Sequence, residues 1–207
     1  MSPTFYFVLA LTAVLATTTY GAVLDINGDT IFRDSYYVLP VIRGQGGGLS
    51  LRGRGDLDVS FGPVISNTLD IVQRSSELEE GIPVKFSNWK IKVAFVPESR
   101  NLNIETVVRA TICIQSTYWR VGEFDEERKQ NFVVAGPQDS QKSFFQIQKC
   151  GDDAYKFVFC PPALETRCSN VGIFVDEVGV RRLALTSEPF LVVFKKANVT
   201  ETLSKTM

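Results

Sequence analysis

Histidine is absent from this chain of 207 residues, and its absence excludes several kinds of chemistry at once. Ser-His-Asp and Cys-His catalysis both need an imidazole, and histidine is also the commonest zinc ligand. The densest acidic group, Glu123-Phe-Asp-Glu-Glu127, is contiguous in sequence. We interpret it as a solvated turn rather than a spaced acid and base pair. The sequence predicts neither an enzyme nor a metal site or cofactor.

Two other charged or glycine-rich groups have simple structural interpretations. Gly44-Gln-Gly-Gly-Gly48 could suggest a phosphate cradle, but no Lys-Ser/Thr ending or helix pattern follows it. We interpret it as a turn. Arg52-Gly-Arg54 and Arg181-Arg182 are expected to be exposed charges at strand ends.

With these kinds of catalysis excluded, the chemistry that remains is recognition of a partner by a cationic side chain. The segment Phe86-Ser-Asn-Trp-Lys-Ile-Lys92 could supply such a side chain. Ser87 and Asn88 favour a turn, because their side chains can bond nearby backbone groups. This interpretation exposes a short segment with Lys90 at its tip. The same residues also alternate apolar and polar up to Val93, as a half-buried strand would. The local pattern leaves both interpretations open.

The composition is that of one globular domain with its own core. Hydrophobic residues make up 44% of the chain, and the net charge is −1. A balanced charge gives no general attraction to nucleic acid or to an anionic membrane. Neither is expected as a partner.

An apolar run from Phe5 to Ala16 has the length of a signal-peptide core and is too short to span a bilayer. A buried helix is the alternative. We expect residues 1–22 to be a signal peptide, with Gly21-Ala22 as one cleavage point. No other stretch is long enough to cross a membrane, so a secreted, soluble protein is expected.

The rest of the chain is a series of short β-branched and aromatic segments separated by turn residues, without a long amphipathic helix pattern. Asn27-Gly28 is a strong tight-turn signal within this series. Regular spacing of this kind predicts an all-β barrel or sandwich. The expected strands are 36–42, 49–51, 70–73, 84–86, 91–96, 102–107, 110–114, 119–121, 131–134, 143–148, 155–159, 172–175, 182–185 and 190–194.

Four cysteines lie in the second half of the chain: Cys113, Cys150, Cys160 and Cys168. In a secreted protein they favour disulfides. Cys160 and Cys168 would close a short loop, at a gain of about 2–3 kcal/mol. Cys113 and Cys150 could also pair, or both could be free thiols. Asn198-Val-Thr200 is an acceptor sequence for N-glycosylation.

Several motifs in order resemble the plant Kunitz inhibitors of the soybean trypsin inhibitor type, with their sporamin- and miraculin-like relatives. The resemblance covers the chain from about Val23 to Lys196. Its motifs are Val23-Leu-Asp-Ile-Asn-Gly-Asp-Thr-Ile31, Tyr36-Tyr-Val-Leu39, Gly46-Gly-Gly-Leu-Ser-Leu51, Glu80-Gly-Ile-Pro-Val84, Tyr155-Lys-Phe-Val-Phe-Cys-Pro161, Cys168-Ser-Asn-Val-Gly-Ile173 and Arg181-Arg-Leu-Ala-Leu185.

The resemblance implies a β-trefoil of twelve strands in three pseudo-symmetric units, six closing a barrel and six capping it. It assigns residues 23–196 to an inhibitor domain and leaves 197–207 as a C-terminal tail. It also implies a plant source, delivery to the vacuole or the cell exterior, and a monomer.

In inhibitory members of the family, a loop after the fourth strand enters a serine protease as a substrate does. Counting forward from Gly81, the basic residue that fills the specificity pocket falls on Lys90, with Ile91 after the scissile bond. Asn88, Trp89 and Lys92 complete the implied reactive loop. A lysine suits a pocket that ends in a carboxylate, as in trypsin.

The chain departs from the family pattern at two places. The usual partner of the cysteine at Cys113 is missing, and Cys150 is additional. The asparagine that often supports the loop is replaced in the region Arg33-Asp34. Asp34 could accept backbone N–H bonds there but could not donate to loop carbonyls.

Three functions remain open from the sequence. The first is inhibition of trypsin-like endopeptidases through Lys90, in plant defence. The second is inhibition of cysteine or aspartic proteases, or of α-amylase, through another loop. The third is a non-inhibitory storage or miraculin-like role.

Overall fold

The fold is described by a computed structural model covering residues 20–53, 69–108, 116–161 and 167–198. In these ranges all regular secondary structure is β-strand. The strands are β1 (Tyr36–Pro40), β2 (Leu49–Gly53), β3 (Leu69–Gln73), β4 (Val84–Ser87), β5 (Asn103–Thr106), β6 (Tyr118–Asp125), β7 (Gln130–Gly136), β8 (Phe145–Lys149), β9 (Tyr155–Phe159), β10 (Ser169–Val175), β11 (Arg181–Thr186) and β12 (Leu191–Lys196).

Six strands close a barrel. β1 pairs with β12 and β4, β4 pairs with β5, and β9 pairs with β8 and β12, all antiparallel. An isolated bridge between Leu102 and Phe145 joins the start of β5 to the start of β8. This bridge completes the ring, so the barrel leaves no open sheet edge between its strands.

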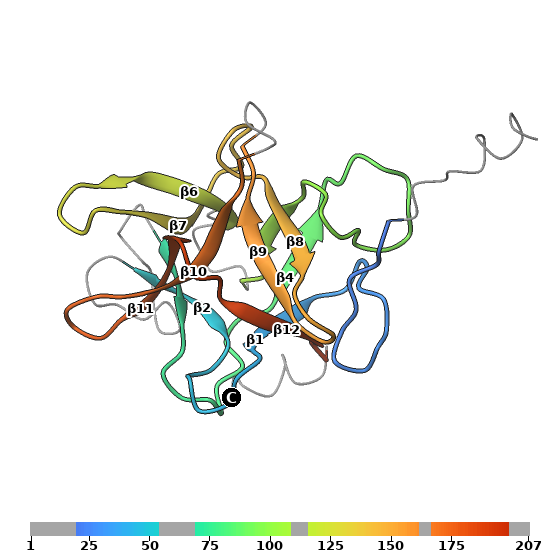
Figure 1. The fold of residues 1–207 in the computed structure, drawn as a ribbon, viewed down its shortest axis with the longest axis horizontal. Helices are drawn as coiled ribbons and strands as arrows, with labels where there is room; N and C mark the ends of the chain where they lie inside the picture. The colour runs from blue at the N-terminus through green and yellow to red at the C-terminus, as the bar shows by residue number, and fades with distance from the viewer. Residues whose placement is uncertain (1–19, 54–68, 109–115, 162–166, 199–207) are drawn as a thin grey trace, which may run out of the picture.

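The other six strands form hairpins that cap one end of the barrel (Figure 1). The hairpins are β2–β3, β6–β7 and β10–β11, and their inner strands touch one another, β3 with β7, β7 with β11 and β11 with β3. A six-stranded barrel with a triangular cap of three hairpins is a β-trefoil. The structure confirms the predicted fold class.

The barrel is filled by large aromatic side chains. Trp119, Phe145, Phe157 and Phe194 are at most 1% exposed, and the Trp119 ring meets Phe157 at 5.4 Å and Phe145 at 6.2 Å between centroids. The indole Nε1–H of Trp119 donates to Thr106 Oγ1 over 3.0 Å, which satisfies its only polar group. Each such side chain stabilises the fold by about 1.5–3 kcal/mol. The loops therefore project from a tightly packed platform.

One expectation about the arginines is wrong. Arg182 is not a free strand-end charge: its guanidinium contacts the buried carboxylate of Asp70, and its Nε donates to Asp176 Oδ2 over 3.0 Å. Arg181, beside it, donates to Gln73 Oε1 over 2.8 Å. The hairpins of the cap meet at these positions, so the side chains at the start of β11 face β3 and not water.

The described cysteines differ in state. Cys160 and Cys168 form a disulfide, with 4.4 Å between their Cα atoms. Cys150 is a free, half-buried thiol in the turn between β8 and β9, where its N–H donates to Ala154 O. The pairing of Cys150 with Cys113 that the sequence allowed is therefore not formed, and Cys113 itself lies outside the described residues.

The ends of the domain are partly described. Gly21 and Ala22, inside the predicted signal segment, lie beside residues 97 and 98: Ala22 bridges Pro97, and Glu98 N–H donates to Gly21 O over 2.8 Å. Asn198, the predicted glycan acceptor, is exposed. None of the described residues belongs to a helix long and apolar enough to cross a membrane.

The turn between β10 and β11 gives an acid-sensitivity prediction. Burial would raise the pKa of Asp176, but hydrogen bonds from Val180 N–H, Arg182 and Val178 N–H outweigh it and lower that pKa. A folded-state pKa below the unfolded one stabilises the fold above the unfolded pKa of about 4, and this gain disappears as pH falls through the folded value. Asp176→Asn should therefore lower Tm at pH 7, with the gap to the parent closing below about pH 4. Thermal unfolding followed by circular dichroism across that range measures it, and a constant gap would contradict it.

Candidate functional site: the loop between β4 and β5

The candidate site is the long connection that follows β4 and arches away from the barrel (Figure 1, green, upper right). Its base is closed by the pairing of β4 with β5, whose last partners are Ser87 and Asn103. Residues 88–102 therefore leave and re-enter the same ladder. A connection closed at its base has both ends fixed by the barrel.

Asn88 turns the chain out of the ladder. Its φ is 64°, in the left-handed region that asparagine tolerates better than most residues. From Asn88 to Phe95, exposed residues alternate with half-buried ones, and Lys90 and Lys92 are among the exposed. The alternation seen in the sequence is thus real.

The segment is nevertheless not a strand, and the prediction of a strand over 91–96 is wrong. The chain bends at residues 90–91 and again at 94–95. In the described part of the molecule, the only backbone hydrogen bond of residues 89–92 is the one that Ile91 O accepts from Val93 N–H, over 3.1 Å. Asn88 directs the chain away from the β4–β5 ladder. The segment that follows is extended, but it has no neighbouring strand to pair with in the described structure.

The first half of the loop is held by its aromatic residue. Trp89 is half-buried and packs against the main core cluster. Its ring lies 6.3 Å from that of Phe32, tilted by 55°, and the guanidinium of Arg33 lies over Phe32 at 5.0 Å. Pairs of this kind contribute about 0.5–1.5 kcal/mol beyond their buried area. Trp89 therefore anchors the residue next to Lys90.

The second half is held by backbone hydrogen bonds from the N-terminal segment. Val96 is fully buried; its N–H donates to Ile31 O over 2.8 Å, and its carbonyl accepts from Val23 N–H over 2.9 Å. Further along, Ser99 N–H donates to Ile147 O over 2.8 Å. These bonds separate the exposed stretch that contains Lys90, residues 88–95, from Ser99 and Arg100, which are also exposed.

Asp34, the predicted loop support, is engaged elsewhere. Its carboxylate forms an exposed ion pair with Lys196, 2.6 Å between Oδ2 and Nζ, which raises the pKa of Lys196. Among the described residues no hydrogen bond joins Asp34 to residues 88–92. The segment before β1 supports the loop through Phe32 and through the backbone of Val23 and Ile31 instead.

Sequence reasoning missed Asn103, which contacts the loop through its side chain. It is fully buried at the start of β5, and its Oδ1 accepts from Asn88 Nδ2 over 2.7 Å. The one sequence signal was a polar residue between Leu102 and Ile104, where the strand is apolar on both sides. That signal marks a buried polar group but does not identify its partner.

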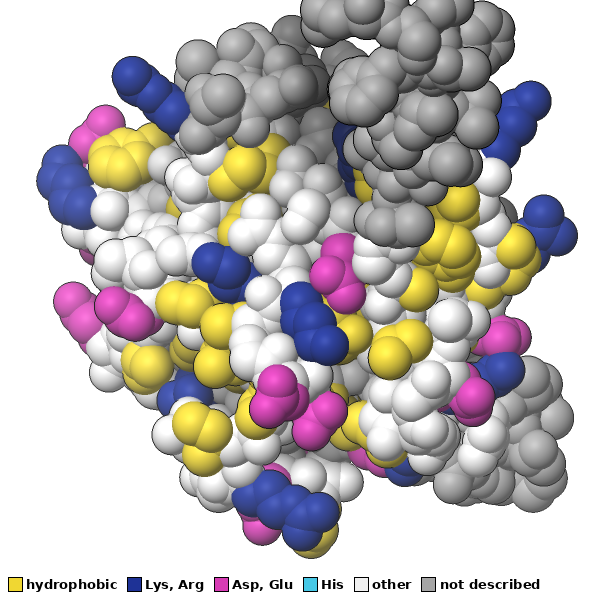
Figure 2. All heavy atoms as spheres, turned by 45° about the vertical axis from the view of Figure 1, so that its right-hand side comes forward, with side chains coloured by type: hydrophobic (Ala, Val, Ile, Leu, Met, Phe, Trp, Pro, Cys, Tyr) yellow, Lys and Arg dark blue, Asp and Glu magenta, His cyan; other side chains and the backbone are white. Residues whose placement is uncertain are grey.

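The arrangement suits recognition by an extended cleft. Lys90 is exposed at a bend, and the unpaired backbone around it can hydrogen-bond to a partner in the way that an added strand does. On the face drawn in Figure 2, the described Lys and Arg side chains are interspersed with Asp and Glu. No cluster of metal-binding side chains occurs among the described residues. Recognition would therefore depend on shape and on one cation, not on a broad charged surface.

Comparison with known proteins agrees with this geometry. The family model described as "Trypsin and protease inhibitor", of the legume Kunitz type, matches residues 23–196. Kunitz trypsin inhibitor 4 of Arabidopsis thaliana is 68% identical over 100% of this chain and 97% of its own length. Miraculin of Synsepalum dulcificum is 33% identical, over 95% of this chain and 96% of its own.

A solved structure shows the same fold in a complex. Soybean trypsin inhibitor bound to porcine pancreatic trypsin superposes with a TM-score of 0.70 at 27% identity, over 86% of this chain and all of that one. The family match spans almost all of the described residues, and the barrel, cap and loop occur in the same chain. The protein belongs to the Kunitz family of trypsin and protease inhibitors, which are not enzymes.

Proposed function

We propose that the protein inhibits trypsin-like serine endopeptidases by binding as a substrate does, with Lys90 in the primary specificity pocket and Lys90–Ile91 as the scissile bond. The observation that carries the proposal is the exposed Lys90 on an extended, unpaired segment anchored at both ends. A lysine side chain complements a pocket that ends in a carboxylate. Asn88, Trp89, Ile91 and Lys92 make the flanking contacts.

The anchoring of the loop at both ends explains why the protein would inhibit the protease instead of being digested by it. A loop already held in its bound shape loses little conformational entropy on binding, so a small contact can be tight. After hydrolysis the two new ends stay beside each other, because Trp89 and Val96 are held independently. The cleaved bond can then re-form instead of releasing product.

We also place the protein in the secretory pathway, with residues 1–22 removed and delivery to the vacuole or the exterior, as a monomer. The Cys160–Cys168 disulfide supports an oxidising compartment. Defence against the digestive proteases of insects or microbes is the role we infer from this activity.

Titration against trypsin of known active-site concentration tests the proposal. Activity should fall linearly and vanish at equimolar inhibitor. Prolonged incubation with catalytic trypsin should produce one cleavage, with Ile91 as the new N-terminus by sequencing.

Chymotrypsin, papain, pepsin and α-amylase serve as comparison targets and should retain most of their activity. Full trypsin activity at a large excess of the protein would contradict the proposal. Inhibition with cleavage at a different bond would contradict the assignment of Lys90.

A further inference from the structure

Asn103 is a buried amide at the centre of a small network below the loop, in which its two amide partners are exposed. Its Oδ1 accepts two hydrogen bonds, from Asn88 Nδ2 over 2.7 Å and from Gln138 Nε2 over 2.8 Å. Its Nδ2 donates to the carbonyl of Ser143 over 2.6 Å. A flipped amide would place its NH₂ against two other NH₂ groups, so the three contacts determine one orientation.

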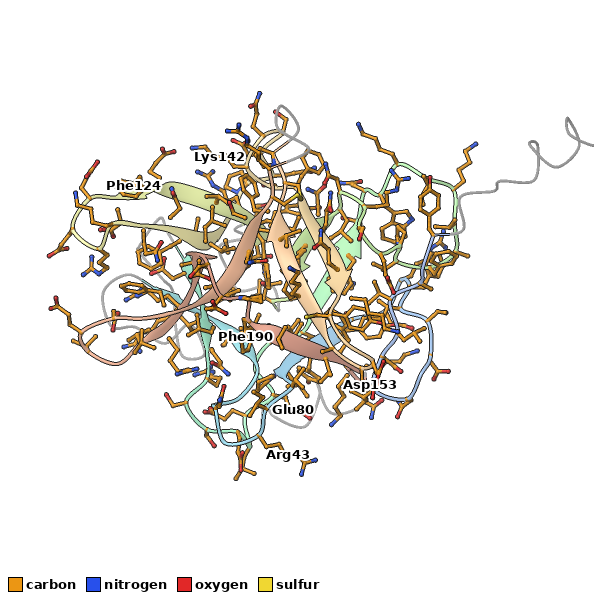
Figure 3. All side chains as sticks on the ribbon, in the orientation of Figure 1. Arg43, Glu80, Phe124, Lys142, Asp153 and Phe190 are labelled. Atoms are coloured by element: carbon orange, nitrogen blue, oxygen red, sulfur yellow. A yellow bond between two sulfur atoms is a disulfide. The ribbon has the colours of Figure 1, made fainter. Side chains whose placement is uncertain are left out.

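The network connects the loop to a second rigid element, the turn between β7 and β8, which Lys142 marks in Figure 3. Ser143 is fully buried, and its Oγ accepts from Asp139 N–H over 2.9 Å. Asp139 Oδ1 in turn accepts from the N–H groups of Gln141 and Lys142, over 2.7 and 2.8 Å, and these bonds lower the pKa of Asp139. The position of Asn103 is therefore set from outside its own strand.

We propose that Asn103 is a positioning residue for the reactive loop and that the Asn88–Asn103 hydrogen bond determines how slowly the Lys90–Ile91 bond is lost. The inference rests on the proposed function. Asn88 is two residues before Lys90, on the side of the scissile bond that becomes the acyl part. It is also the residue at which the chain leaves the ladder with φ 64°. Holding its side chain fixes the direction in which Trp89 and Lys90 project.

The chemical consequence concerns a reversible hydrolysis. Water adds across the Lys90–Ile91 peptide bond and leaves a carboxylate on Lys90 and an ammonium on Ile91; resynthesis expels the same water. Resynthesis needs the carboxylate to stay beside the amine. Val96 holds the amine side through the N-terminal segment, whereas Asn103 and the Phe32–Trp89 contact hold the carboxylate side.

Asn88→Asp is the deciding variant, because it keeps the size of the side chain and its tolerance of positive φ. It replaces the donor by a carboxylate that faces the acceptor Asn103 Oδ1. Asn88→Gly, which also tolerates positive φ, removes the donor without repulsion. Asn88 is exposed, so neither change disturbs the core. Loss of one such bond should speed cleavage at Lys90–Ile91 by about five- to tenfold in Asn88→Gly, and by more in Asn88→Asp.

Asn170→Ala is the matched control. Its amide donates to Ser187 O over 2.9 Å on the cap, away from the loop. The test measures the rate of Lys90–Ile91 cleavage by mass spectrometry and the return of trypsin activity over time. Asn88→Asp and Asn88→Gly should inhibit at first and then lose inhibition, whereas the parent and Asn170→Ala should stay inhibitory.

Amide hydrogen exchange in the free protein separates this inference from the proposed function. The N–H of Val93, which donates to Ile91 O, should exchange faster in both Asn88 variants than in the parent or Asn170→Ala, whether or not trypsin is inhibited. Equal exchange rates, or equal cleavage rates in an inhibitory parent, would overturn the positioning role. A parent that never inhibits trypsin, together with faster exchange in the variants, would overturn the proposed function alone.

Discussion

Lys90→Glu should abolish inhibition of trypsin while leaving the fold intact. In the proposed complex the ammonium of Lys90 meets a buried carboxylate, and the substitution brings a second carboxylate to that position. Removing one partner of a buried ion pair costs about 3–5 kcal/mol, which corresponds to a rise in Ki of about a hundred- to several-thousandfold. Ki from steady-state inhibition of trypsin measures the effect. Lys90→Ala should lose a similar amount, and Lys90→Arg should remain inhibitory.

Lys92→Ala provides the matched comparison, because Lys92 is a second exposed lysine on the same loop. Exposed charges at the rim of an interface contribute little, so its Ki should change by less than about tenfold. Both variants should unfold like the parent, since substitutions at exposed positions shift stability by no more than about 0.5 kcal/mol. Lys90→Glu inhibiting as well as the parent would remove Lys90 from the specificity pocket.

A change of specificity would strengthen the assignment further. Lys90→Leu should lose trypsin and gain a chymotrypsin-like target, because the loop presents whatever side chain stands at that position. The anchors at Trp89 and Val96 do not involve the side chain of residue 90. If this variant inhibits a chymotrypsin-like protease instead of trypsin with the loop geometry unchanged, then the scaffold determines the shape of the loop and residue 90 determines the target.

Much of this fold could be predicted from short-range signals. Asn27-Gly28 forms the expected turn, with Gly28 at φ 83°, and most predicted strands in the described ranges lie at nearly the predicted bounds. The predicted strand 110–114 lies outside the described residues. The exception is instructive. Residues 91–96 have the alternating pattern of a strand, but a strand also needs a neighbouring strand to pair with. The positive φ of Asn88 turns the chain out of the ladder before this segment, and that φ could not be read from the pattern.

The site was predictable only in part. Lys90 could be located because a motif leads into the loop from Gly81. Its supports could not, because Asn103, Gln138 and Phe32 are brought to it by barrel closure and not by sequence spacing. The same limitation explains the error at Arg182, whose partner Asp70 lies 112 residues away.

Arg182→Met should be the most destabilising single change outside the aromatic core. The Asp70 carboxylate is 1% exposed in its side chain and contacts the Arg182 guanidinium, which is 17% exposed. Methionine fills much of the same volume but leaves a buried carboxylate without this cation. Breaking a buried pair in this way costs about 3–5 kcal/mol. Urea unfolding at pH 7, with the disulfide intact, measures the loss as a lower midpoint at unchanged slope.

The neighbouring position supplies the control. Arg181 also crosses from β11 to β3, but it donates to the neutral Gln73, so Arg181→Met should cost only about 1 kcal/mol. Removing both charges of this pair, with Arg182→Met and Asp70→Leu together, should recover part of the stability lost in the single variant, since the buried charge of Asp70 is gone and Asp176 keeps its hydrogen bonds from Val178 and Val180 N–H. If the double variant is as unstable as Arg182→Met alone, then the charge of Asp70 is not the cause, and the cap depends on the shape of the arginine instead.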